Sequence, residues 1–343
     1  MNENDWKLTL KAVNELSAQV ELAGLLQGAI RSNFLQYCRK PTTVDELAKV
    51  TGLPTGIVDN ACLALQYLGV LRRGVDDQVI ISEVYAPLLD RGLDQRVLDR
   101  LTAAPVRASI LGNALDSAHS SYWSIDSASR VALAANATAD PRTEFGREAL
   151  VASVRSDQAL HEAFTRGGRF LDLGCGVAGG IITFLYFYPS LSAVGIDIAD
   201  DVLTVARTRA QTVGVDDRVT FLAADAANYR DSEPFDFVFW PQNFYPEASR
   251  ADALSTAFTN LRPGGMLLTV HLPRQTSHSP GVTEPDAASA GPALDRLLLG
   301  LSGIERRRLD ALTTELSEAG FVDITAGAAV PPVLPLVQAR RPQ

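Results

Sequence analysis

The sequence predicts an α/β protein in which a mainly helical N-terminal domain precedes a parallel β-sheet with helices on both faces. From about residue 169 onward, short apolar segments alternate with helical patterns, which is typical of a parallel sheet. The segment FLDLGCGVAGG at 170–180 joins one such strand to a helix through glycines. The first 100 residues instead show helical periodicity and a short hairpin pattern. A length of 343 residues with 46% hydrophobic content is ample for two cores.

Charge and cysteine content exclude several classes of protein. A net charge of -9 disfavours nucleic acid and anionic membranes as partners, because nothing supplies the field that neutralises phosphates. Three cysteines without metal or CxxC spacing indicate neither a disulfide framework nor a zinc site. No spacing typical of a metal site occurs, and the N-terminus lacks the basic and apolar regions of a signal peptide. We therefore predict a cytoplasmic, metal-independent protein.

The N-terminal 100 residues follow a helix, turn, helix, wing order. Apolar residues at helical spacing predict a packing helix over 8–30, with Leu16, Val20, Ala23 and Leu26 or Gln27 on one face. Thr43 to Glu46 forms a capping box for a helix that stops at Gly52, and a second helix is expected over 55–67. A hairpin turns at 74–77. DNA binding is disfavoured, since segment 55–67 carries no Lys or Arg and residues 1–100 hold 11 basic against 13 acidic side chains.

A mainly helical connector is expected over 92–166, followed by the alternating region. The connector is predicted to roof a site, and its aromatics Tyr122, Trp123, Phe145 and Phe164 either line a cavity or, more commonly for such positions, belong to the core. Residues 274–293 are rich in Pro, Gly, Ser and Ala and predict a loop beside the site. Strands are expected at 169–173, 192–197, 218–223, 235–240, 265–271, 321–326 and 333–340, and helices from 200, near 248–260 and at 304–319.

The glycine segment predicts a site for a nucleotide cofactor. Glycines at 174, 176 and 179 lack the Cβ atoms that would keep a ligand from the backbone, and the next helix starts with unpaired N–H groups. The spacing also satisfies the dinucleotide fingerprint, with Asp197 about twenty residues on. However, Asp172 would place a carboxylate near a pyrophosphate, whereas it suits an ammonium or sulfonium. A turn without a ligand, and helix capping by the acids, are the structural alternatives.

Five ordered pieces resemble the class I S-adenosylmethionine-dependent methyltransferases. They are LDLGCG, the strand-end acid of VGIDIA, the acid of AADA, the strand FDFVFW and the turn RPGG, and they cover roughly 165–340. The pieces TTVDELAKVTGLP and LALQYLGVL resemble the N-terminal dimerisation domain of the small-molecule O-methyltransferases. The resemblance implies a Rossmann-like doubly wound sheet and a homodimer, with a winged-helix dimerisation domain at 1–100, a connector at 101–165 and a cofactor-binding domain at 166–343.

The same resemblance assigns roles to the residues at the strand ends. Asp172 would lie near the amino acid end of S-adenosylmethionine, with Asp197 at the ribose hydroxyls and Asp225 at the adenine amine. The remaining cofactor-binding residues implied are Gly174, Gly176, Ile198, Ala226 and Trp240.

The catalytic position departs from the family pattern. O-methylating members carry a His in a segment resembling HDWxDE after the fourth strand, and here Asn243 stands in its place. Asn cannot act as a base. Either His271 or Glu247 takes the proton, or the acceptor is a nitrogen or carbon atom, or the chain is an inactive cofactor-binding regulatory protein. The function expected is methyl transfer to a small-molecule acceptor in secondary metabolism.

Overall fold

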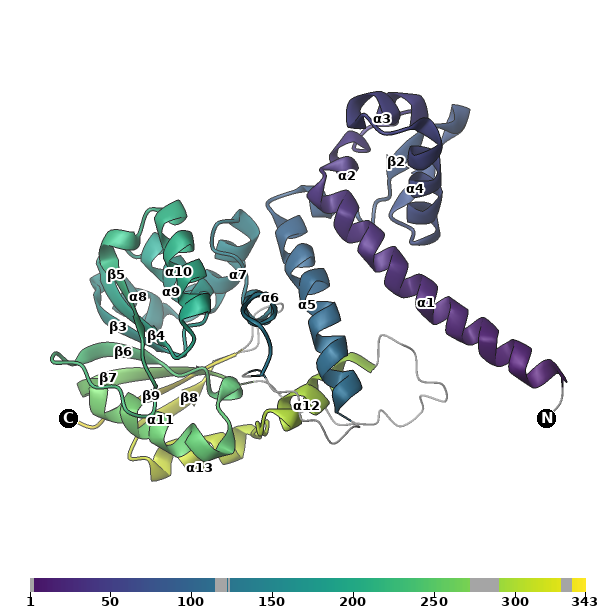
Figure 1. The fold of residues 1–343 in the computed structure, drawn as a ribbon. Helices are drawn as coiled ribbons and strands as arrows, with labels where there is room; N and C mark the ends of the chain where they lie inside the picture. The colour runs from purple at the N-terminus through teal and green to yellow at the C-terminus, as the bar shows by residue number, and fades with distance from the viewer. Residues whose placement is uncertain (1–2, 115–121, 123, 272–289, 328–334) are drawn as a thin grey trace. The chain divides into compact units, whose positions relative to one another are not determined.

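The computed structural model describes residues 3–114, 122, 124–271, 290–327 and 335–343, which form two compact units (Figure 1). The first unit is Met1–Ala104 and the second is Pro105–Gln343. Within the described ranges, no helix combines the length and the apolar character needed to cross a bilayer. The predicted α/β fold class is confirmed, with a helical N-terminal unit and a seven-stranded sheet in the second unit.

The first unit contains the predicted order of helices followed by a hairpin. Thr43 accepts from the Glu46 amide and Glu46 from the Thr43 amide, so the capping box is present, and the helix it starts ends at Gly52 in the left-handed conformation. The hairpin strands pair antiparallel. The elements are α1 (Glu3–Arg31), α2 (Phe34–Tyr37), α3 (Val44–Thr51), α4 (Thr55–Tyr67), β1 (Leu71–Arg73), β2 (Val79–Ile81) and the start of α5 (Leu93–Asn113).

Helix α1 buries only its C-terminal part within the chain. Leu26, Ala29 and Ile30 lie in the core of the first unit. Leu16 and Val20, predicted to lie on the packing face, are 64% and 69% exposed. The periodicity correctly identified the helix, but the described residues cover only the C-terminal part of its apolar face.

In the second unit the strands form one sheet in the order β5-β4-β3-β6-β7-β9-β8. Strands β3 to β7 are parallel, and β9 runs antiparallel to both of its neighbours, as predicted for the last strand. The turn at Pro263 to Gly265 interrupts the pairing of β7 with β6. The strands are β3 (Gly168–Leu173), β4 (Leu191–Asp197), β5 (Val219–Ala223), β6 (Phe235–Phe239), β7 (Leu261–Val270), β8 (Val322–Ala326) and β9 (Leu336–Arg340).

Two hydrophobic cores hold helices against the two faces of this sheet, and alternate residues of β3 point into each. Phe170 packs with helices α7, α8, α9 and α10, whereas Leu171 and Leu173 pack with α11 and α13. Phe164 belongs to the first core, so the core interpretation holds for it, while Trp123 lies outside the described residues. The helices are α6 (Ser127–Ala137), α7 (Glu144–Arg155), α8 (Gln158–Arg166), α9 (Gly179–Phe187), α10 (Asp200–Val213), α11 (Glu247–Asn260), α12 (Gly291–Leu301) and α13 (Leu309–Glu318).

The segment after β7 differs from the prediction. Helix α12 begins at Gly291, inside the stretch predicted to be a loop, and α13 begins at Leu309 rather than at 304. The rest of the predicted loop, 272–289, lies outside the described residues. Small residues and Pro at the start of α12 resemble a loop composition, although Pro is well tolerated in the first turn of a helix.

Candidate functional site

The order of the strands places a crevice at the carboxyl ends of β3 and β6. The chain moves outward from β3 through β4 to β5 and then returns to β6 on the other side of β3. Helix α9, which follows β3, packs in one core, and α11, which follows β6, packs in the other. The connections therefore diverge between β3 and β6, which is where open α/β sheets bind their ligands.

The glycine turn after β3 leaves open space at Gly176, whereas a Cβ on Gly174 would lie 3.3 Å from the Tyr245 hydroxyl oxygen. Gly174 and Gly176 adopt φ values of 70° and 54°, and no described atom lies within 4 Å of a Cβ built on Gly176. Gly179 serves a different purpose, because a Cβ there would lie 2.4 Å from Thr138 Oγ1. The third glycine thus lets the connector pack on α9 rather than admitting a ligand.

Asp197, at the end of β4, is bonded to the glycine turn. Its Oδ2 accepts from the Gly176 amide at 2.9 Å and its Oδ1 from the Ala199 amide at 2.9 Å. Each oxygen keeps a further lone pair for a ligand hydroxyl. Burial raises the pKa of Asp197, and the two amide bonds act against that shift. The next residue, Ile198, is 57% exposed, an apolar surface at the strand end.

Asp225 lies beyond the end of the neighbouring strand β5. Its side chain is exposed and accepts from the Ala227 amide at 2.9 Å, while Ala226 is buried. The Ala224 amide donates to the Asp197 carbonyl at 3.0 Å, which ties the two strand ends together. Asp197 and Asp225 therefore lie along one edge of the sheet.

Asp172 is a buried carboxyl near the end of the central strand. It is the penultimate residue of β3, is 5% exposed, and its Oδ1 has no hydrogen-bond partner among the described residues. Burial, together with the negative charge of Asp197, raises the pKa of Asp172 to about 8. A carboxyl kept neutral and unpartnered at the end of the central strand is suited to a cationic ligand, which would allow it to ionise.

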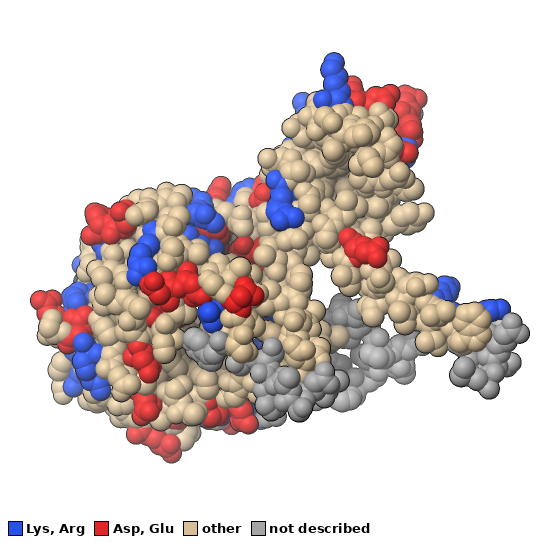
Figure 2. Space-filling view, viewed as in Figure 1, with Lys and Arg blue, Asp and Glu red and all other residues tan. Residues whose placement is uncertain are grey.

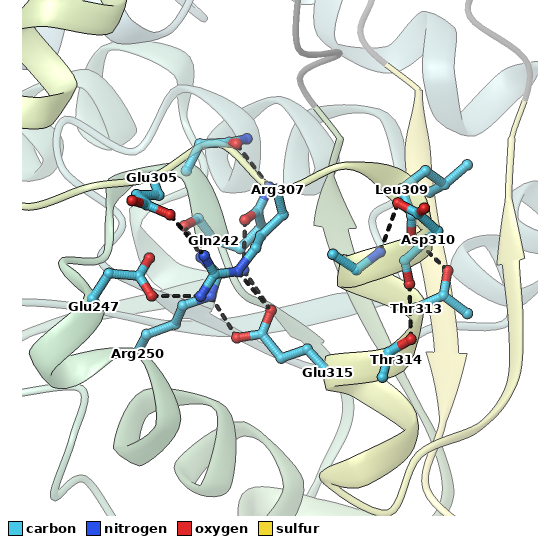
Figure 3. Close-up of polar contacts among 12 residues, drawn as sticks. Gln242, Glu247, Arg250, Glu305, Arg307, Leu309, Asp310, Thr313, Thr314 and Glu315 are labelled. Atoms are coloured by element: carbon cyan, nitrogen blue, oxygen red, sulfur yellow. Dashed lines mark hydrogen bonds and ion pairs between the residues drawn. The ribbon is translucent and has the colours of Figure 1, made fainter.

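A buried guanidinium holds the loop that follows β6 (Figure 3). Arg250 of α11 donates to the Gln242 carbonyl and to Gln242 Oε1, both at 2.7 Å, and to Glu315 of α13 at 2.8 Å. Its guanidinium also lies 4.7 Å from the centroid of the Trp240 ring. This Arg250 clamp fixes Pro241 to Tyr245 against the sheet. Sequence reasoning missed it, because an Arg in an amphipathic helix usually indicates solvent.

Trp240 and Asn243 are both enclosed by this packing. Trp240 is fully buried in the core of the α11 face, with no partner for its indole Nε1 in the described part of the chain. Asn243 Nδ2 donates to the Val270 carbonyl at 3.0 Å, and its Oδ1 accepts from Gln242 Nε2 at 2.7 Å. The Asn243 amide is thus occupied by the protein itself.

The two remaining candidates for the base differ in their surroundings. His271 directly follows Val270, and the Val270 carbonyl accepts hydrogen bonds from the side-chain amides of Asn243 and Gln242. The backbone amide of His271 donates to the Pro335 carbonyl at 3.1 Å. His271 Nε2 is enclosed and has no partner among the described residues. Glu247 begins α11, is 41% exposed and forms an ion pair with Arg307 (Figure 3).

The connector lies beside the edge of the sheet that carries Asp197. Arg130 of α6 pairs with Asp201 of α10 at 2.8 Å, and its Nη1 donates to the Tyr122 carbonyl at 3.3 Å. Burial and then the charge of Asp197 raise the pKa of Tyr122, so this side chain lies near Asp197. Across the described residues, no group of three or more His, Cys, Asp or Glu side chains is arranged to hold a metal ion.

Comparison with known proteins finds similarity to methyltransferases. Residues 164–287 match a family described as a methyltransferase domain. Over 156 residues the chain is 30% identical to methyltransferase GfsG of Streptomyces halstedii, and over 162 residues 27% identical to erythromycin 3''-O-methyltransferase of Saccharopolyspora erythraea. These alignments cover 44% and 47% of this chain, and 49% and 52% of the relatives, so the chain spans about half the length of the curated relatives it matches.

The similarity of fold to solved structures extends over the whole chain. The structure of human N-acetylserotonin methyltransferase in complex with S-adenosylmethionine superposes with a TM-score of 0.68 over 100% of both chains, at 14% identity. The chain therefore shares the fold of this structure, and the match to a methyltransferase domain covers residues 164–287.

The raised pKa of Asp172 predicts a pH-dependent stability that Asp172→Asn removes. Between pH 4 and 8 the unfolded carboxyl ionises while the folded one stays protonated, so raising the pH lowers the free energy of unfolding. Over this window, the free energy of unfolding of the Asn variant should rise relative to that of the unmodified protein by about 1 kcal/mol for each pH unit. Urea unfolding of both cofactor-free proteins from pH 5 to 8 measures the difference. Asp217→Asn, at an exposed site, is the control, and parallel curves for Asp172→Asn would contradict the assignment.

Proposed function

We propose that this protein transfers a methyl group from S-adenosylmethionine to a small-molecule acceptor. The observation that supports this most directly is the glycine turn after β3, with Asp172, Asp197 and Asp225 placed at the ends of three adjacent strands. A donor with a sulfonium and an ammonium is positively charged at its reactive end, and carboxylates favour such a ligand over a pyrophosphate.

The residues present fit this cofactor. Asp172 Oδ1 is enclosed without a partner, Gly176 leaves its Cβ position open, and Asp197 holds spare acceptor capacity. Asp172 would hold the ammonium, Asp197 the ribose hydroxyls and Asp225 the adenine amine, with Ile198 and Ala226 beside the base. Gly174 and Gly176 let the ligand approach the backbone. Trp240 supports this site from within the core rather than facing the ligand.

Asp197→Ala is expected to weaken S-adenosylhomocysteine binding by about 1 to 3 kcal/mol, because the ribose hydroxyls lose their acceptor. Isothermal titration calorimetry measures the affinity. Asp197→Asn keeps one acceptor oxygen for the Gly176 or Ala199 amide and separates ligand contact from damage to the turn. Asp200→Ala, in the next helix, serves as the control. Unchanged affinity in both Asp197 variants would rule out the ribose assignment.

His271 is the residue best placed to take a proton from the acceptor. Asn243 is bonded at both ends of its amide and Glu247 is paired with Arg307, whereas His271 Nε2 has no partner in the described part of the chain. Two side-chain amides on the Val270 carbonyl fix the backbone immediately before His271. S-adenosylmethionine supplies the methyl group, and His271 would hold the acceptor proton at Nε2.

If the acceptor is a hydroxyl, His271→Gln should lower kcat by about 100-fold or more and leave cofactor affinity unchanged. Turnover of labelled S-adenosylmethionine with a panel of phenols, alcohols and amines measures kcat, and calorimetry measures the cofactor affinity. An unchanged kcat on the best hydroxyl acceptor would remove His271 from the mechanism. Cofactor binding without turnover of any acceptor would instead favour the inactive regulatory alternative.

The exposed half of α1 supports a homodimer that forms through the first unit. Its apolar residues recur at spacings of three and four and form one stripe. Figure 2 shows that this part of the helix is mainly uncharged between its two ends. A stripe of this length is an unfavourable surface for an isolated chain. The stripe consists of Trp6, Leu10, Val13, Leu16 and Val20, each between 44% and 69% exposed. We assign it to a second copy, with the first unit acting as a winged-helix dimerisation domain in a cytoplasmic enzyme of secondary metabolism.

Leu16→Glu with Val20→Glu is expected to convert a dimer into a monomer, since two charges would be buried at the interface. Light scattering after size-exclusion chromatography measures the mass against that of the 36.8 kDa chain. Leu8→Glu is the matched control, because Leu8 is 66% exposed on the same helix but lies off the stripe. A monomeric unmodified protein, or a dimer that survives the double substitution, would count against this interface.

A further inference from the structure

The hydroxyl of Tyr245 is an enclosed polar group for which the fold supplies no partner. Its ring is partly exposed, but its Oη is buried and without a hydrogen bond in the described part of the chain. A Cβ placed on Gly174 would lie 3.3 Å from this oxygen, so Tyr245 reaches across the crevice from the loop after β6 to the turn after β3. A buried hydroxyl without a partner costs free energy, which a ligand contact can recover.

The surroundings place this hydroxyl near two carboxyls of the candidate cofactor site. Burial raises the pKa of Tyr245, and among the nearby charges Asp172 contributes most and Asp197 next. Asp172 is the residue assigned to the amino acid end of the donor and Asp197 the one assigned to the ribose. The sulfur of the donor joins these two parts covalently, so a hydroxyl beside the Gly174 turn and near both carboxyls is well placed to meet the sulfur.

The chemistry of the hydroxyl suits a positive centre. The phenol stays protonated because burial and the neighbouring carboxylates oppose its ionisation. Its oxygen still presents lone pairs. The nearby carboxyls of Asp172 and Asp197 make the space beside this oxygen favourable for a cation. The hydrogens of a methyl group on a sulfonium carry partial positive charge, so they can donate weak C–H···O contacts that the charge strengthens.

We propose that the Tyr245 hydroxyl oxygen contacts the methylsulfonium group of the donor and makes the site prefer the charged donor over its neutral thioether product. The inference rests on the proposed function. Tyr245 is then a positioning residue for the methyl group and a determinant of selectivity between donor and product. The preference would also limit inhibition by the product.

The loop that carries Tyr245 is held firmly enough for this role. The Arg250 clamp bonds Gln242 three residues earlier, and the Tyr245 and Trp240 ring centroids lie 6.2 Å apart. Substitution by Phe removes the oxygen while keeping the ring in this packing. Tyr188→Phe is a matched control, because Tyr188 is a buried tyrosine of the same unit whose hydroxyl bonds His161 at 2.9 Å, outside the site.

The test is calorimetric titration of Tyr245→Phe, Tyr188→Phe and the unmodified protein with S-adenosylmethionine and with S-adenosylhomocysteine. Tyr245→Phe should raise the Kd of S-adenosylmethionine about 5-fold or more and that of S-adenosylhomocysteine less than 2-fold. Tyr188→Phe should change neither. The ratio of the two Kd values reports on the sulfonium alone, because partial unfolding of a preparation lowers the binding stoichiometry and leaves this ratio unchanged.

Each other outcome overturns the proposal in a recognisable way. Equal losses for both ligands would place the hydroxyl at the amino acid or ribose end. Unchanged Kd values for both ligands would show that Tyr245 Oη makes no contact with the cofactor. Failure of the unmodified protein to bind either ligand would refute the proposed function itself, and is distinct from both of these results.

Discussion

The burial of carboxyl groups around the glycine turn after β3 is the constraint on which the rest of the second unit depends. Asp172 is held at the end of the central strand where water cannot solvate its charge, and the nearby charge of Asp197 adds to the cost. The folded state tolerates this free-energy cost because two hydrophobic cores pack against β3, one on each face. Asp197, in turn, bonds the Gly176 amide and sets the shape of the turn. One set of side chains thus shapes the backbone and carries the charge for a cationic ligand.

Features with a local cause could be predicted from the sequence. The capping box at Thr43 and Glu46 and the left-handed stop at Gly52 are each complete within a few residues. The alternation of strands and helices likewise predicts the parallel sheet, because periodicity is a local property. The strand-end acids then follow from topology, since the carboxyl ends of parallel strands share one edge. Their grouping at that edge needed no knowledge of side-chain packing.

Features whose cause lies far away in the sequence could not be predicted. Gly179 has the spacing of a ligand-binding glycine, yet the atom that forbids a side chain there belongs to Thr138, about forty residues earlier. Arg250 resembles a solvent-facing helical charge, but Glu315 and Gln242 enclose it. The exposed half of α1 has the periodicity of a packed helix because periodicity records that a face is apolar. It does not record whether the face belongs to the same chain or to another.

The proposed shift of the catalytic base to His271 follows from the geometry of adjacent strands. Neighbouring parallel strands lie about 4.8 Å apart, so residues that follow β6 and β7 reach the same part of the crevice. Asn243 keeps the position after β6 but uses its amide to bind the carbonyl of Val270, the residue before His271. A residue that cannot accept a proton thereby fixes the backbone beside one that can. An imidazole after β7 approaches the acceptor from a different direction than one after β6. A base after β7 in place of one after β6 would therefore change the shape of the acceptor that the site takes. It would leave the chemistry of methyl transfer the same.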